Sequence, residues 1–93
     1  MLEMQIIGKD IESVDEFHDK IQEELEFPDY YGANLDALYD MVSMISEETY
    51  IEMDLSDMED EAMKTYLKRV WNVLCDAAEE NLCLEIRRVD DEE

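Results

Sequence analysis

The stretch Phe27–Asp40, FPDYYGANLDALYD, gathers aromatic, turn-forming, helix-capping and acidic residues in one short segment. Pro28 cannot continue a preceding helix, which predicts a loop before position 34. Asn34 is a favoured N-cap, because its side-chain oxygen accepts the free backbone N–H groups of a first helical turn. A hydrophobic core needs few of the polar groups in this segment. Their excess points to a surface made for a partner.

Three segments outside this stretch have the alternation of apolar and polar residues that is typical of half-buried strands. They are Leu2–Ile7, Thr49–Leu55 and Leu82–Ile86. Predicted helices connect each strand to the next, and such connections favour parallel strands joined by right-handed crossovers. We therefore expect an α/β fold in which a three-stranded parallel sheet packs against three to four helices.

Apolar residues at helical spacing predict the first two helices, which follow one another between the first and second strands. Ser13 begins the first helix as its N-cap, and Glu16, three residues later, completes a capping box. Asn34 begins the second helix, and Leu38 and Val42 mark its core-facing side. The first crossover is therefore expected to contain two helices.

The third predicted helix covers Met58–Glu80 and leads to the last strand. Ser56 or Asp57 is expected to cap it. The helix is either continuous or broken near Lys64, which leaves three or four helices in the fold. Trp71 lies on its apolar stripe and is expected to be the largest side chain of the core.

Charge is the extreme feature of the composition. The chain has 7 Lys+Arg and 28 Asp+Glu, a formal net charge of −21. Nucleic acids and anionic membranes need cations on a protein that binds them, so this charge argues against both as partners. It attracts basic proteins and accelerates their encounter. The alternative is that much of the charge serves general solubility.

The 93 residues are expected to form a single domain, 1–93, with an acidic, mobile tail from about residue 89. Met1–Ile7 lacks the cationic start and the long apolar run of a signal peptide. No apolar run approaches the ~20 residues that span a bilayer. We therefore expect a cytoplasmic protein.

Residues that commonly carry catalysis or hold metals are sparse. One His and two Cys cannot supply the four closely spaced ligands of a metal site, so neither a metal nor a cofactor is expected. His18 lies beside apolar residues and is interpreted as structural. Cys75 and Cys83 are interpreted as buried free thiols, with a disulfide between them as the alternative. Asp36 and Asp40 have no nucleophile, Lys or His nearby, so we do not expect an enzyme.

The candidate binding surface lies in the opening stretch. Tyrosines offer large, rigid contact areas, and carboxylates can meet Arg, Lys or His or stand where a phosphate would stand. Asp36 and Asp40 are like charges four residues apart, which costs helix stability and hints at function. The alternative is that one tyrosine packs on the core, the glycine only turns the chain, and the aspartates only solvate the helix. The candidates are Tyr30, Tyr31, Gly32, Asn34, Asp36, Tyr39 and Asp40.

These residues resemble the signature of the barstar family of ribonuclease inhibitors. The strongest part is YYGANLDALYD, Tyr30–Asp40, preceded by the FP pair at 27–28. A second similarity is IIG at Ile6–Gly8 followed by the pair FH at 17–18. The resemblance extends from about residue 5 to residue 86. It implies a three-stranded parallel sheet with helices and an inhibitor that blocks the cleft of a barnase-like, guanyl-specific ribonuclease.

The resemblance also implies roles for individual residues. Asp40 would imitate the scissile RNA phosphate among the basic residues of the nuclease, and Asp36 would pair with a cation at the rim. Tyr30 would stack on the enzyme, while Gly32 would allow close approach of the backbone. The implied partner-binding set is Tyr30, Tyr31, Gly32, Asn34, Leu35, Asp36, Tyr39, Asp40 and, on the later helix, Asp76.

Several positions depart from the family pattern. Ala33 stands where the family has an acidic residue, Asp76 where it has Glu, and Tyr39 where it usually has Trp. Ile45 stands where the type member has a second Trp. These departures concern the target and not the fold. An inhibitor that binds its nuclease one-to-one as a monomer is the first hypothesis. A module that binds a different basic toxin or nucleic-acid-binding protein by acidic mimicry is the second, and a small hydrolase with clustered acids is the third.

Overall fold

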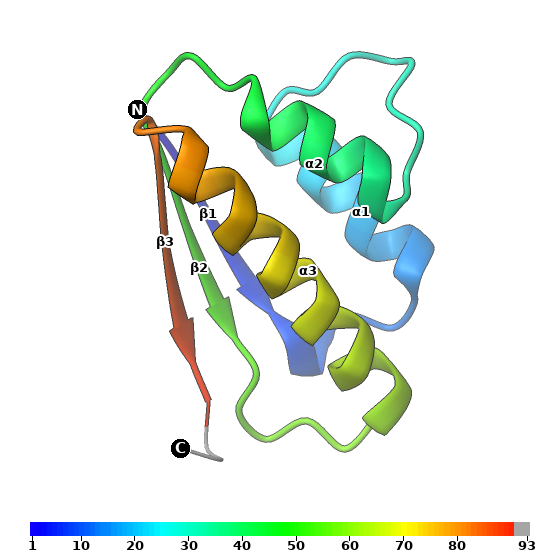
Figure 1. Cartoon of the computed structure of the whole chain (residues 1–93). Helices are drawn as coiled ribbons and strands as arrows, with labels where there is room; N and C mark the ends of the chain where they lie inside the picture. The colour runs from blue at the N-terminus through cyan, green and yellow to red at the C-terminus, as the bar shows by residue number, and fades with distance from the viewer. Residues whose placement is uncertain (91–93) are drawn as a thin grey trace.

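A computed structural model describes residues 1–90, in which strands and helices follow one another as Figure 1 shows. Within these residues there are three α-helices and one 3-10 turn, and none of the helices is long and apolar enough to cross a membrane. The elements are β1 (Leu2–Ile7), η1 (Gly8–Asp10), α1 (Val14–Glu24), α2 (Leu35–Ser43), β2 (Thr49–Asp54), α3 (Glu61–Glu80) and β3 (Leu84–Val89).

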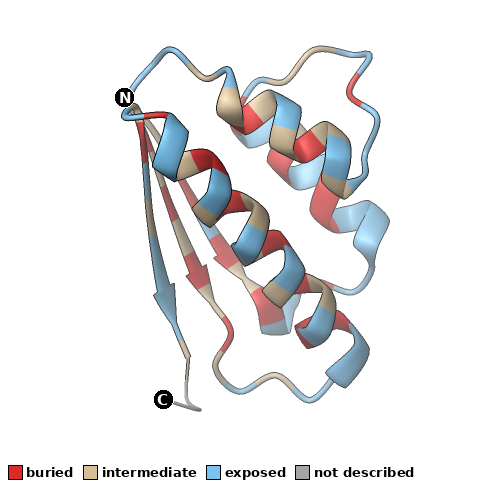
Figure 2. Ribbon diagram, viewed as in Figure 1, coloured by how far each residue is buried: buried red, intermediate tan, exposed pale blue. Residues whose placement is uncertain are grey.

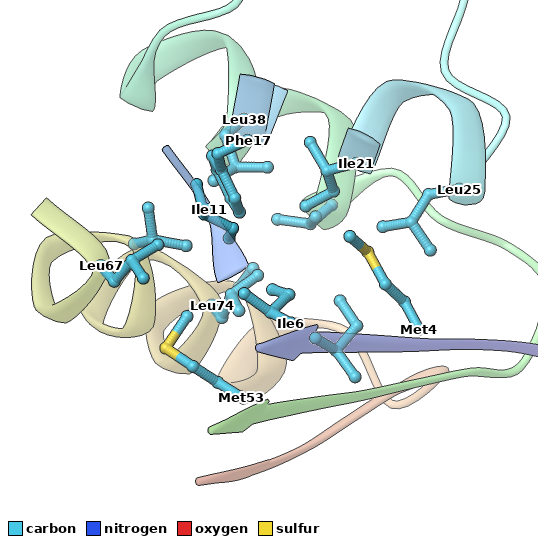
Figure 3. Packing of buried hydrophobic residues seen from close by; sticks show 14 of the residues in the cluster. Met4, Ile6, Ile11, Phe17, Ile21, Leu25, Leu38, Met53, Leu67 and Leu74 are labelled. Carbon is cyan, nitrogen blue, oxygen red and sulfur yellow. The ribbon is translucent and has the colours of Figure 1, made fainter. Parts of the chain in front are cut away.

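The three strands form one sheet in the order β1-β2-β3, and both pairs are parallel. This confirms the predicted α/β fold class. Leu2 lies opposite Thr49, which lies opposite Leu84, so the strands begin at the same level. The three α-helices all lie on one face of the sheet (Figures 1 and 3).

The other face of the sheet carries polar side chains. Glu52, on the central strand, accepts hydrogen bonds from Gln5 Nε2 at 3.0 Å and from the Tyr50 hydroxyl at 3.4 Å. Its carboxylate also lies 3.9 Å from Arg87 Nη1. Parallel sheets usually have both faces covered by helices. Here the helices cover one face only, and the row of polar contacts between strands suits the other face to contact with water.

The hydrophobic core lies between the sheet and the helices, where the buried sides of the elements face one another (Figures 2 and 3). Alternate residues of β1 and β2 point into it, because side chains alternate across a strand. Full burial of each large apolar side chain contributes about 1.5–3 kcal/mol. The largest apolar side chains that are fully buried include Phe17, Ile6, Ile21, Leu38, Ile51, Met53, Leu55, Leu67 and Leu74.

The first two helices begin where the capping residues predict. Ser13 Oγ accepts the backbone N–H of Glu16 at 3.1 Å, and Asn34 Oδ1 accepts that of Ala37 at 2.8 Å. Both bonds satisfy donors that a helix cannot satisfy within its own first turn. Asn34 thereby sets the start of α2 and the direction in which its acidic residues point.

The third helix begins later than predicted, at Glu61 and not at Met58, and runs without a break through Lys64. Its N-cap is Asp60, whose Oδ1 accepts the backbone N–H of Met63 at 3.1 Å. The fourth helix that a break would have produced is therefore absent from residues 1–90.

The residues predicted to cap this helix belong instead to the turn after β2. Asp54 Oδ1 accepts hydrogen bonds from the backbone N–H of Ser56 at 2.9 Å and from its hydroxyl at 2.6 Å. Asp57 adopts a left-handed φ of 59°. Short polar side chains form such local turns in competition with helix starts, which explains why the prediction failed at this point.

The last strand is shifted along the chain relative to the prediction. Leu82 was expected to begin the strand, but it is 97% exposed and β3 begins at Leu84. Val89 was expected in the mobile tail, but it is the last residue of the strand. The rest of that predicted tail beyond Asp90 lies outside the described residues.

Three side chains predicted to be buried are only half-buried. Trp71 lies at the rim of the core, where the Arg88 guanidinium carbon is 5.5 Å from the centroid of its ring. Phe17, and not Trp71, is the largest fully buried side chain of the described residues. Cys75 and Cys83 are free thiols, but both are partly accessible.

Candidate functional site

The two neighbouring tyrosines of the loop between α1 and α2 have different environments. Tyr30 is 78% exposed, whereas Tyr31 is only 8% exposed. The backbone N–H of Tyr31 donates to the Pro28 carbonyl at 3.0 Å, and that carbonyl also accepts Gln22 Nε2 at 2.9 Å. The loop is thus fastened to α1, with Tyr31 turned inward and Tyr30 presented outward. Tyr31 was predicted as a contact residue, but its side chain belongs to the core.

Tyr31 joins a buried hydrogen-bonded group centred on His18. The Tyr31 hydroxyl lies 2.6 Å from His18 Nδ1, and the Tyr66 hydroxyl lies 2.7 Å from Nε2. A neutral imidazole has one donor and one acceptor nitrogen, so one tyrosine donates and the other accepts. Burial raises the pKa of Tyr31 and of Tyr66, which keeps both hydroxyls protonated. The group connects α1, the loop and α3, and it gives His18 the structural role that was predicted.

We expect the stability of the protein to fall as the pH falls below the ordinary pKa of histidine. Burial lowers the pKa of His18 from 6.5, although Asp15 and Asp19 raise it in part. The unfolded chain therefore binds a proton more readily than the folded one, and this contribution is complete above about pH 6.5 and lost as the pH falls through the lowered pKa. Urea unfolding at about pH 7.5 and about pH 5.5 measures it.

His18→Gln is the control for this pH dependence, because the rest of the acidic surface stays the same. The difference in free energy of unfolding between wild type and His18→Gln should shrink on acidification. A difference that stays constant between the two pH values would contradict the assignment.

Gly32 is needed for space and not for a left-handed backbone. A Cβ at this position would lie 3.3 Å from Ala37 Cβ and 3.4 Å from Asn34 Nδ2. The left-handed residue of the turn is its neighbour Ala33, with a φ of 54°. The alternative reading, in which Gly32 only turns the chain, does not fit its backbone; a side chain here would crowd the first turn of α2.

Asn34 and Leu35 connect this turn to the helix. Asn34 uses both ends of its amide within the chain, since Oδ1 caps α2 and Nδ2 donates to the Gly32 carbonyl at 3.3 Å. Leu35 is half-buried and packs against the core cluster. Both residues therefore have structural roles, whatever contact they make with a partner.

Asp36 and Asp40 form an acidic row on α2. Both are exposed, and residues four apart lie one above the other on a helix face. Asp36 lies in the first turn, where a negative charge suits the helix dipole, but Asp40 lies near the C-terminal end, where it does not. The stability of the helix therefore does not account for Asp40.

Tyr39 links this row to α3. Its hydroxyl donates a hydrogen bond to Glu80 Oε2. The pKa of Tyr39 is raised, first by this bond, then by desolvation and by the negative charges of Glu80, Asp76 and Asp40. The hydrogen bond joins α2 to α3, and the charges of Asp40 on α2 and of Asp76 and Glu80 on α3 all act on the Tyr39 phenol. We call Asp36, Asp40, Asp76 and Glu80, with Tyr39 among them, the acidic face.

Glu80 was absent from the predicted set. Its spacing from Asp76 carried a signal, because residues four apart on α3 share a face. The signal was incomplete, because nothing in the sequence shows that this face of α3 lies beside Tyr39. The contact joins residues 41 positions apart in the chain.

Asn81 holds the C-terminal end of α2, whereas Asn34 caps its N-terminal end. It is 9% exposed, and its Nδ2 donates to the carbonyls of Val42 at 3.0 Å and Ile45 at 2.9 Å. Its Oδ1 accepts the backbone N–H of Cys83 at 3.0 Å. The last carbonyls of a helix have no partner within the helix, and here the residue after α3 supplies one.

We expect Asn81→Ala to lower the free energy of unfolding by about 1–3 kcal/mol, because the carbonyls at the end of α2 lose their buried donor. Urea unfolding measures the change. Asn72→Ala removes an exposed amide from the middle of α3 and should have little effect. Equal losses for the two variants would contradict the role given to Asn81.

The arrangement suits recognition of cations more than chemistry. Within residues 1–90, no group of three or more His, Cys, Asp or Glu side chains is placed to hold a metal ion. The carboxylates of the acidic face are exposed and come from two fixed helices. Such a surface can bind a cluster of Arg, Lys and His side chains on another protein.

Comparison with known proteins agrees with the fold. Residues 1–90 match the family model described as "Barstar (barnase inhibitor)". A segment of 43 residues is 46% identical to "Putative ribonuclease inhibitor YrdF" of Bacillus subtilis (strain 168). That segment is 46% of this chain and 47% of the relative, so the match spans about half of each protein. The match to the family model covers nearly all of the sequence, and the chain belongs to the barstar family.

Proposed function

We propose that this protein is an inhibitor of a barnase-like, guanyl-specific ribonuclease, and not an enzyme itself. The observation that carries the proposal is the acidic face, where Tyr39 of α2 donates a hydrogen bond to Glu80 of α3 and exposed carboxylates are present on both helices. Membership of the barstar family and the name of the Bacillus subtilis relative support it. The net charge of −21 adds long-range attraction for a basic enzyme.

The proposed mechanism is occlusion of the active-site cleft together with imitation of the substrate. Asp40 stands where the scissile phosphate would stand and meets the basic residues that hold it. Asp36 and Asp76 bind cations at the rim, and Glu80, held by Tyr39, adds a further carboxylate. Tyr30 supplies an exposed aromatic ring for stacking, which costs little conformational entropy.

The remaining predicted contact residues act mainly by position. Gly32 leaves room for a close approach, and Asn34 and Leu35 set the start of α2. Tyr31 holds the loop through His18 and does not touch the nuclease. We propose further that the chain is one domain, acts as a monomer in the cytoplasm and binds its target one-to-one, without a cofactor.

Titration of the protein into a guanyl-specific ribonuclease of the barnase type tests the proposal. RNA cleavage is followed at about 0.05 M and about 0.5 M NaCl, because salt screens exposed charges strongly at the higher value. Stoichiometric inhibition at both concentrations is the expected result. Lack of inhibition at both would refute the proposed target.

A different basic toxin is the second candidate for the target. The features that favour it are Ala33, Tyr39 and Ile45, where the residues differ from the family pattern in or beside the site. On this view the acidic face still binds cations, but those of another protein. Capture of such a protein by wild type but not by Asp40→Asn, with no inhibition of the ribonuclease, would identify it.

A further inference from the structure

A groove with a volume of about 360 Å³ opens between the loop that carries Tyr30 and the C-terminal end of α2. Tyr30 and Met44 line it and are 78% and 66% exposed. Phe27, Met41 and Ile45 add partly buried apolar surface. Large apolar side chains exposed together around a hollow are typical of a binding site.

The groove is continuous with the acidic face. Asp40 is four residues after Asp36 on one side of α2, and Met44, the C-cap residue four positions further on, continues this row past the end of the helix. Tyr30 comes from the loop that leads into the same helix. A protein that covers both Tyr30 and the acidic face therefore also covers the groove.

The charges around the groove narrow the choice of occupant. Glu26 and Glu47 line it, and no Lys or Arg does. The Glu47 carboxylate already lies 3.3 Å from the N-terminal amine. The Glu26 carboxylate is exposed, so a cation on the occupant could pair with it. The thioethers of Met41 and Met44 adapt to side chains of different shape. An apolar side chain next to a Lys or Arg fits this combination.

We propose that the groove receives an apolar side chain of the same basic protein that the acidic face binds, with a neighbouring cation of that protein facing Glu26. The proposal rests on the proposed function and extends it. The acidic face supplies attraction that salt weakens, while the groove supplies apolar contact that salt does not weaken. The groove therefore retains affinity at high ionic strength and selects among basic nucleases by the shape of one side chain.

Two substitutions without a change of charge test the groove. Met44→Gln removes an exposed apolar wall, and Ser46→Trp places a bulky ring among the lining residues. Val89→Thr, at the end of β3, removes exposed apolar surface away from the groove and is the matched control. Inhibition constants for a barnase-type ribonuclease are measured at about 0.05 M and about 0.5 M NaCl, with urea unfolding as a check on stability.

Both groove variants should weaken inhibition by about tenfold or more at both salt concentrations, the size expected for a buried apolar contact at an interface. Val89→Thr should inhibit like wild type. Groove variants that inhibit as well as wild type overturn this inference alone. Failure of wild type to inhibit overturns the proposed function and this inference together. Self-association of wild type that Ser46→Trp abolishes, seen by analytical ultracentrifugation, overturns it by making a second copy the occupant.

Discussion

Asp40→Asn should weaken inhibition of the ribonuclease by about 2–5 kcal/mol, or roughly 30-fold to several thousand-fold, because a charge pair buried at the interface loses one partner. This range of binding free energies includes values known for charge pairs of barnase and barstar, and it is applied here to a protein of the same family. The substitution keeps the shape of the side chain and removes its charge. Inhibition constants measured at low and high salt give the change.

Glu85→Gln is the matched control for Asp40→Asn. It removes one negative charge from an exposed position on the polar face of the sheet, away from the acidic face. Equal effects of the two substitutions would mean that only the total charge matters. That result would favour broad acidic mimicry over a site centred on Asp40.

The stability of Asp40→Asn separates a loss of contact from a loss of fold. Asp40 lies near the C-terminal end of α2 and four residues after Asp36, and both circumstances disfavour a negative charge there. The free energy of unfolding should therefore stay the same or rise slightly. A variant that binds poorly because it has become unstable would contradict this explanation of Asp40.

His18→Leu should lower the free energy of unfolding by about 2–4 kcal/mol, because it leaves the Tyr31 hydroxyl buried without a partner and the Tyr66 hydroxyl short of one. The leucine keeps most of the apolar volume, so the loss reports the hydrogen bonds and not a cavity. Urea unfolding near neutral pH measures it. Inhibition assayed under native conditions shows whether the loosened loop also misplaces Tyr30.

The double substitution His18→Leu with Tyr31→Phe distinguishes stranded polar groups from lost packing. Removal of both hydrogen-bonding partners can be nearly neutral, whereas removal of one leaves an unsatisfied group. The double variant should therefore be more stable than His18→Leu alone. A double variant that is less stable would show that the hydroxyl of Tyr31 is not what His18 supports.

Local patterns were sufficient to predict the order of elements, the parallel sheet and the direction of the acidic row. Ser13 and Asn34 were located correctly because a cap bonds to a backbone group only three residues away. The same reasoning failed after β2, where Asp54 accepts the N–H of Ser56 in a local turn and Asp60, not Ser56 or Asp57, caps α3. Several local partners of similar strength make such a segment ambiguous in the sequence.

What the sequence by itself determined about this protein is its α/β fold, its extreme negative charge and a helix that carries Asp36 and Asp40 on one face. Only the tertiary structure decided that Tyr31 turns inward while Tyr30 stays exposed, and that Tyr39 meets Glu80. The reason is distance along the chain. Helix caps and strand alternation depend on near neighbours, whereas the contacts of His18 with Tyr66 and of Tyr39 with Glu80 join residues 48 and 41 positions apart. Such pairs exist only once α1, α2 and α3 pack side by side over the same face of the sheet.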